Sequence, residues 1–175
     1  YMINVPALKA HHRAGMTLIA KNHFGSHTQS SAKHLHMGLV NPDGQPVANP
    51  NRAGYGLYRI QVDLLGHKHL GAKTMLVVVD GLWGGPDAND RSCKWEMAPF
   101  NNDWPSSIFM SMDQVAIASV CLDFLKAEFS PDHHEKTYPQ MEGVDDYLQQ
   151  ATDPANWPEG IEYYPESDGT LLGSL

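Results

Sequence analysis

The 175-residue sequence is poor in cysteine and has no long hydrophobic run. Cys93 and Cys121 are its two cysteines, and no CxxC pair occurs, so they cannot form a metal cluster alone. Cys121 lies on an apolar helical stripe and is expected to be a buried thiol, while a disulfide between the two stays open. No segment approaches the roughly 18 consecutive apolar residues of a membrane span, so we expect no membrane-spanning helix in this sequence.

Several short motifs of common enzyme classes are also missing. The sequence contains no GxSxG, no Walker A and no GxGxxG. These absences argue against hydrolase, nucleotide-phosphatase and dinucleotide-binding functions, because each motif builds the phosphate cradle or nucleophile turn that its chemistry requires.

Basic residues are scarce in the second half of the chain. Residues 1–86 carry eight Lys and Arg against three acids, whereas residues 87–175 carry four against seventeen, and eight of the ten histidines lie in the first half. A basic, histidine-rich half within an acidic protein favours a local anion or metal site, not a nucleic-acid surface. The alternative is that the two halves neutralise each other across the fold.

The length and the order of elements predict one α/β domain over residues 1–175, with a mainly parallel sheet flanked by helices and an irregular acidic tail over residues 131–175. The sequence begins in a strand-like segment, so we expect it to be the C-terminal part of a larger protein. The expected strands are 2–6, 74–79 and 107–111. The expected helices are 16–23, 28–37, 56–66, 113–128 and a short one near 144–150, with a polar connection over 7–15 and loops over 40–55 and 82–106.

The strand and helix patterns are clearest at two places. The β-branched run over 74–79 predicts a strand buried on both faces, ended by Asp80. Over 113–128 the spacing of the apolar residues predicts one buried stripe, with Ser111 and Gln114 as a capping box and Asp113 at the positive end of the helix. The members of this stripe are Ile117, Val120, Cys121, Phe124 and Leu125.

The densest cluster of polar side chains follows the first expected strand. Ligands of α/β folds bind where strands end and helices begin, and free amides there favour an anion. Lys9 would add a charge, and Thr17 and Lys21 share one helix face. The alternative is an ordinary amphipathic helix with a solvated lysine. The candidates in this cluster are Lys9, His11, Thr17, Lys21, Asn22 and His23.

Two HxH pairs, His34 with His36 and His67 with His69, are candidate ligands of a divalent metal. In an extended segment the side chains at i and i+2 point the same way, so each pair could chelate one ion. In a helix they diverge, and the alternative is that these are surface histidines.

Asp80 and Asp113 each follow a strand end, with Ser111 beside the second. If the strands are parallel, both carboxylates converge with Lys9 and His11 at one edge of the sheet, suited to acid–base work or to a cation. The alternative is that Asp80 belongs to a turn and Asp113 caps its helix.

Three tryptophans of the long loop either line a pocket or pack the loop down: Trp83, Trp95 and Trp104.

Residues 3–11 and 15–25 resemble the "INVPxLKxH…GxTLxxKNxFG" core of family 362 of the domains of unknown function. Residues 77–81 are similar to its "vvDg" strand end and residues 111–116 to its "S-x-D-x-VA" element, although Ala118 stands where a second aspartate is frequent. The family is bacterial and archaeal, is sometimes fused to iron–sulfur modules, and has many exported members, so an exported location is expected and a cytoplasmic one stays open. The resemblance implies site roles for Lys9, His11, Lys21, Asn22, Asp80 and Asp113.

The sequence leaves three functions in competition. The first is binding of an anionic small molecule, with or without a divalent metal, at the strand ends; whether a reaction follows stays open. Lys9, His11, Lys21 and Asp80 are its candidate catalytic residues, and Thr17, Asn22, His23, Ser111 and Asp113 its candidate ligand-binding residues. The second is an interaction module or redox accessory subunit that uses the acidic, tryptophan-containing half, with self-association open. The third is metal storage or sensing by histidines. No iron–sulfur cluster is expected within the chain, because it lacks a cysteine cluster.

Overall fold

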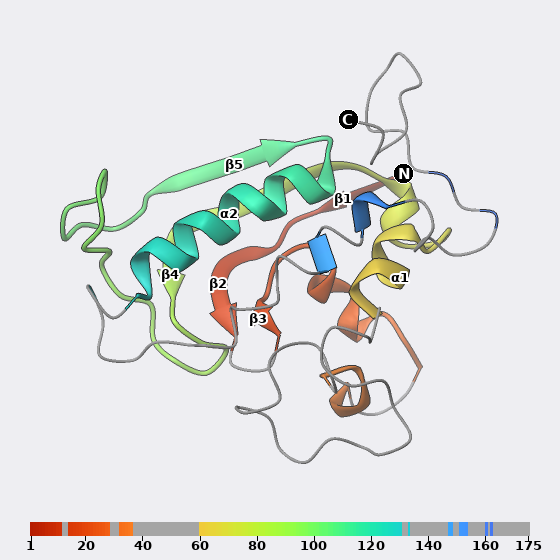
Figure 1. The fold of residues 1–175 in the computed structure, drawn as a ribbon, viewed down its shortest axis with the longest axis horizontal. Helices are drawn as coiled ribbons and strands as arrows, with labels where there is room; N and C mark the ends of the chain where they lie inside the picture. The colour runs from red at the N-terminus through yellow and green to blue at the C-terminus, as the bar shows by residue number, and fades with distance from the viewer. Residues whose placement is uncertain are drawn as a thin grey trace.

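A computed structural model describes residues 1–11, 14–28, 32–36 and 60–130, and beyond them residues 133, 147–148, 151–153, 160 and 162. The fold is a mixed sheet with helices packed on it (Figure 1). The strands are β1 Met2–Asn4, β2 Ala7–His11, β3 Gly15–Met16, β4 Thr74–Gly85 and β5 Ser107–Ser111. The helices are the 3₁₀ helices η1 Lys21–Gly25, η2 Lys33–His36 and η4 Gly71–Lys73 and the α-helices α1 Ile60–Gly66 and α2 Gln114–Glu128.

The long strand β4 is the centre of the sheet. β1 and β2 pair with it in parallel, one after the other along the same side, with a register shift in each pairing. β5 pairs with its other side in antiparallel orientation, and β3 adds an antiparallel edge beside β2. The sheet is therefore mixed, with its two N-terminal strands parallel to β4, and together with the flanking helices it confirms the predicted α/β class.

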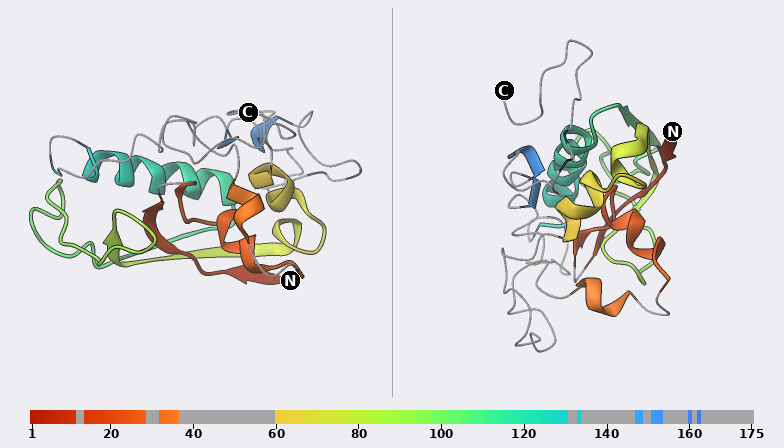
Figure 2. Two further views of the ribbon diagram at one scale, coloured as in Figure 1. Left: turned by 90° about the horizontal axis from the view of Figure 1, so that it is seen from below. Right: turned by 90° about the vertical axis from the view of Figure 1, so that its right-hand side faces the viewer.

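Helices cover one face of this sheet. α1 and α2 lie on the same side of it (Figure 2), and there Val77 and Val79 of β4 are fully buried. On the other face Asp80 and Leu82 are exposed, and Ile3 of β1 is 57% exposed. The prediction that 74–79 is buried on both faces is therefore wrong, because the intervening residues of β4 have no helix against them in the described part of the chain.

The helix predicted over 113–128 is confirmed as α2, but its cap differs from the prediction. Asp113 is the N-cap, and its carboxylate accepts hydrogen bonds from the first-turn amides of Val115 and Ala116. Ser111 accepts one from the amide of Asp113 instead of forming a capping box. Val120 is 48% exposed, so the buried stripe is narrower than expected.

The N-terminal region contains more strand and less helix than predicted. The expected polar connection over 7–15 contains β2, whose Leu8 and Ala10 are fully buried. The expected helix over 16–23 is replaced by β3, a turn and the short η1. Only Lys33–His36 of the expected helix over 28–37 is helical, as η2, within the described residues.

The long loop after β4 is packed against the sheet and α2. Trp95 is fully buried and makes edge-on contacts with Phe100 and Phe129. The buried Glu128 of α2 accepts hydrogen bonds from the amides of Glu96 and Met97. Trp95 therefore anchors the loop, whereas Trp83 is exposed and Trp104 is half-buried.

Several expectations fall on residues outside the described ranges, namely the loop over 40–55 and most of the tail over 131–175. Cys93 and Cys121 are both free thiols. In the described part of the chain, none of the helices has both the length and the apolar character that a membrane span requires.

Candidate functional site

The candidate site is built around Lys9, the central residue of β2. Lys9 lies opposite Gly85 at the carboxyl end of β4 and is half-buried. Its carbonyl accepts hydrogen bonds from both the amide and the hydroxyl of Thr17, at 3.0 and 3.1 Å. Thr17 thereby holds the returning chain beside β2 and leads it into η1.

Lys21, the first residue of η1, comes close to Lys9. Its Nζ lies 5.0 Å from the centre of the Phe24 ring. Burial and the charge of Lys9 lower the pKa of Lys21 to about 8, and Asp87 acts in the opposite direction. The structure therefore gathers Lys9, Lys21 and the buried Asp87 in one region, with two positive charges and one negative charge.

His11, at the end of β2, continues this region through an aromatic layer. Its ring stacks on His36 at 5.3 Å between centres, and His36 meets Phe24 edge-on at 5.0 Å. Nδ1 of His11 accepts a hydrogen bond from the amide of Ala14. In the neutral ring of His11 the proton must therefore sit on Nε2.

Asn22 and His23 connect η1 to β1 through the buried Asn4. The Asn4 side chain donates to the carbonyl of Ile19 and accepts from Asn22, and its Nδ2 lies 3.4 Å from Nε2 of His23. Burial, and then the neighbouring His67, lower the pKa of His23. These contacts fix the position of η1, and with it the position of Lys21.

The connection into η1 also contains a strained residue. Ile19 is buried and has a φ of 41°, a backbone conformation that β-branched side chains avoid. The hydrogen bond from Asn4 to its carbonyl helps to hold this conformation.

Asp80 does not lie where the sequence predicted. β4 continues past it to Gly85, so Asp80 is an exposed residue within the strand, opposite Ala7 of β2 and Ile108 of β5. Its Oδ1 accepts a hydrogen bond from the amide of Leu82. The expectation that Asp80 ends the strand is therefore wrong.

Ser111 and Asp113 lie near the opposite end of the sheet from Lys9. Because β5 is antiparallel to β4, Ser111 pairs with Val77 near the start of β4, whereas Lys9 pairs with Gly85 at its end. The predicted convergence of Asp113 with Lys9 at one edge of the sheet is therefore wrong. Asp113 caps α2, which was the alternative interpretation.

The HxH pairs differ in their surroundings. Lys33–His36 forms the 3₁₀ helix η2, so the backbone there is not the extended one for which chelation by His34 and His36 was predicted. The rings of His67 and His69 lie 5.7 Å apart, and Nδ1 of His67 accepts from the amide of His69. Among the described residues, no group of three or more His, Cys, Asp or Glu side chains is arranged to hold a metal ion. The metal role of these histidines stays a prediction.

Sequence reasoning missed two members of the site, Asp87 and Phe24. Asp87 follows the end of β4, so the error about where that strand ends hid its place beside Lys9 and Lys21. Phe24 sits three residues after Lys21, a spacing that brings side chains together within one 3₁₀ turn, and that spacing was a usable signal.

Comparison with known proteins identifies the family of the chain. The sequence profile of a domain of unknown function, DUF362, matches residues 1–123, which include all five strands and the whole candidate site. The search of curated proteins and the search of solved structures each found no match. Since the profile covers more than half of the sequence, the chain belongs to the DUF362 family.

Proposed function

We propose that this DUF362 protein binds a small anionic molecule between Lys9 of β2 and Lys21 of η1, beside the carboxyl end of β4. The observation that supports the proposal is the close approach of two lysines in partly buried positions, where the charge of Lys9 disfavours the charge of Lys21. Asp87 offsets one of the two positive charges. An anion placed between the lysines would remove the remaining repulsion.

The residues around the two lysines would have distinct roles. His11, at the end of β2, would lie beside the anion, with its ring oriented by the hydrogen bond that Nδ1 accepts from the Ala14 amide. Thr17 and Asn22 would position β2 and η1. Ser111 and Asp113 lie near the other end of the sheet, and neither they nor Asp80 are included in the proposed site.

Ligand-dependent stabilisation tests the proposal. Unfolding of the full chain is followed by differential scanning calorimetry with sulfate, phosphate or succinate, at constant ionic strength against chloride. An anion at a hundred times its Kd stabilises the folded state by about 2.7 kcal/mol, which raises Tm by about 5–10 °C for a chain of this size.

Matched variants locate the binding site. Lys9→Met and Lys21→Met should each abolish the anion-dependent rise in Tm, whereas Lys73→Met, which removes an exposed lysine at the end of η4, should keep it. If none of the three anions raises Tm, or if the first two variants respond like wild type, the proposal is wrong.

The pH dependence of sulfate binding gives a second test. Sulfate keeps its charge between pH 7 and 9, whereas Lys21, with a pKa of about 8, loses most of its proton. Sulfate affinity should therefore fall by about three- to tenfold over this range. Equal affinity at both pH values in isothermal titration calorimetry would exclude Lys21 from the site.

A further inference from the structure

Among the described residues, β5 is an unprotected edge of the sheet. In the described part of the chain it pairs with β4 alone, and Figure 1 shows it along the outside of the sheet. Natural edge strands are usually protected by lysine, proline, a bulge or a covering segment. Ser107–Ser111 contains no charged residue and no proline, and its register with β4 is regular.

The hydrogen-bonding groups on the outer side of β5 can be assigned from the sheet. The amide of Asp80 donates to Pro6, away from β5, so the main-chain groups of its neighbour Val79 point towards β5. Val79 pairs with Phe109. By alternation along the strand, the amides and carbonyls of Ile108 and Met110 point away from the sheet.

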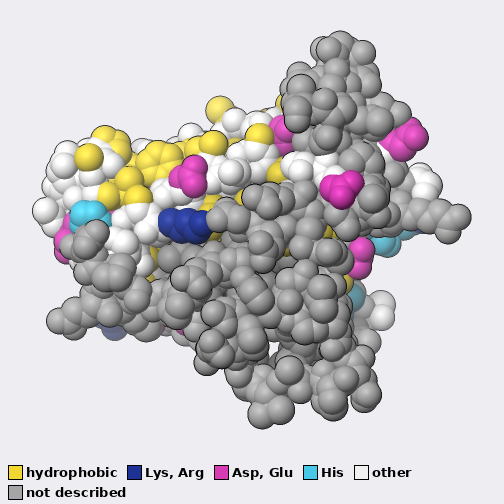
Figure 3. Space-filling model, viewed as in Figure 1, with side chains coloured by type: hydrophobic (Ala, Val, Ile, Leu, Met, Phe, Trp, Pro, Cys, Tyr) yellow, Lys and Arg dark blue, Asp and Glu magenta, His cyan; other side chains and the backbone are white. Residues whose placement is uncertain are grey.

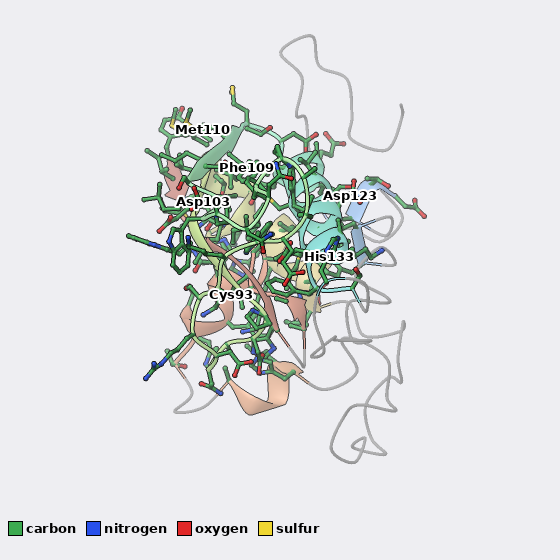
Figure 4. The ribbon with its side chains drawn as sticks, turned by 90° about the vertical axis from the view of Figure 1, so that its left-hand side faces the viewer. Cys93, Asp103, Phe109, Met110, Asp123 and His133 are labelled. Carbon is green, nitrogen blue, oxygen red and sulfur yellow. The ribbon has the colours of Figure 1, made fainter. Side chains whose placement is uncertain are left out.

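Exposed hydrophobic side chains follow the same edge. Ile108, Met110 and Met112 are 59, 66 and 65% exposed. Figure 3 shows hydrophobic side chains gathered over β5 and α2, and Figure 4 places Met110 on the side of the sheet away from Asp123 of α2.

The outer side of α2 extends this apolar edge. Val120 of α2 is 48% exposed and lies one helical turn before Phe124, whose ring contacts Phe109 of β5 at 5.3 Å. The stripe of α2 that faces β5 therefore carries Val120 as well.

We propose that β5 pairs with β5 of a second copy of this chain, antiparallel, about a two-fold axis through Phe109. Ile108 then lies opposite Met110 of the second copy and Met110 opposite its Ile108, each as a hydrogen-bonded pair that uses the outward main-chain groups. Phe109 lies opposite Phe109 of the second copy as a non-hydrogen-bonded pair. The two α2 helices come side by side over the joined sheet and cover Val120.

Charge and area both suit a second copy. Because β5 is uncharged, self-pairing places no like charges opposite each other, and the Ile–Met pairs are favourable on a sheet surface. The four exposed side chains contribute on the order of 400 Å² per copy, and with the strand's main chain the dimer buries about 1,200 Å² in total, the lower limit for a specific interface. We therefore expect a dimer with a micromolar Kd.

Analytical ultracentrifugation of the full chain over about 1–200 μM tests the proposal with two matched substitutions. Ile108→Lys places on β5 the residue that natural edge strands use against pairing, and should raise the dimer Kd at least tenfold. Ile3→Lys makes the same change at an equally exposed position, 57%, on the open face of the sheet away from β5, and should leave Kd unchanged. A chain that stays monomeric at 200 μM overturns the proposal, as does a dimer that Ile3→Lys weakens as much as Ile108→Lys does.

A disulfide tests the position of the two-fold axis. In a non-hydrogen-bonded antiparallel pair the Cα atoms lie about 4.5 Å apart, within the range that a disulfide spans. Phe109→Cys, in a Cys93→Ser background, should therefore form a covalent dimer under mild oxidation. Leu82→Cys in the same background provides an exposed thiol on β4, one strand in from the proposed edge, and should stay monomeric on a non-reducing gel. Equal crosslinking of both variants, or none at Phe109→Cys with circular dichroism unchanged, contradicts the assigned register.

Discussion

Replacing Lys21 with methionine should stabilise the protein at neutral pH. The pKa of Lys21 falls from 10.5 to about 8, mainly through burial and then through Lys9, so the folded state disfavours the charged amine. A shift of this size corresponds to roughly 3 kcal/mol. Because the ammonium keeps some solvent contact, screening reduces this penalty to about 1–2 kcal/mol. The substitution also removes the cation–π contact between Lys21 and Phe24, which lowers the gain by about 0.5 kcal/mol. The expected net gain from Lys21→Met at pH 7 is therefore about 1 kcal/mol.

The pH dependence of this gain has a definite sign. Between about pH 8 and 10.5 the unfolded wild-type chain binds more protons at Lys21 than the folded chain does, so wild-type stability rises with pH across this window. Below pH 8 the full penalty is present. The advantage of Lys21→Met should therefore be largest near pH 7 and should vanish near pH 10.5.

Urea unfolding at pH 7 and at pH 10.5, followed by circular dichroism without added anions, measures the difference. Lys73→Met is the control, since it removes an exposed lysine, and its effect on the free energy of unfolding should be small and equal at both pH values. A destabilised Lys21→Met variant at pH 7, or a gain that does not change with pH, would refute the reasoning.

Two further substitutions test the packing of the loop and the cap of α2. Gly84→Ala should cost about 2–3 kcal/mol, because the added Cβ would overlap the buried ring of Trp95; Gly25→Ala, where the Cβ meets nothing within 4 Å, should change the urea midpoint little. Asp113→Ala should cost about 1 kcal/mol through loss of the cap. Asp123→Ala, at an exposed position within the same helix, should leave Tm unchanged or slightly raised, and equal effects of the two aspartate variants would remove the capping role.

Elements with strong local signals could be predicted from the sequence. β5 has the predicted bounds, and α2 differs from the prediction by one residue at its start, because helical periodicity and an N-cap aspartate are properties of short segments. β2 was missed although its pattern alternates. Leu8 and Ala10 are buried and alternate with the more exposed Ala7 and Lys9, but four of the five residues are small or polar, which made the segment resemble a loop.

The arrangement of the site depended on information that no short segment carries. The direction of β5 follows from the path of the long loop that precedes it, so the sequence alone could not show that Asp113 would lie far from Lys9. The continuation of β4 past Asp80 to Gly85 was hidden because an Asp-Gly pair usually marks a turn. Here the missing side chain of Gly84 makes room for Trp95, a contact that exists only in the folded protein.

The strands that pair with β4 reach it from very different distances along the chain. β5 follows β4 after one loop and leads directly into α2, whereas β1 and β2 come from the start of the chain. Closing the longer loop costs more entropy, so pairing of β4 with β5 is favoured early in folding and docking of β1 and β2 comes late. Lys9 and Gly85 thus meet in one of the last steps, and a ligand held there should slow unfolding while leaving the folding rate almost unchanged.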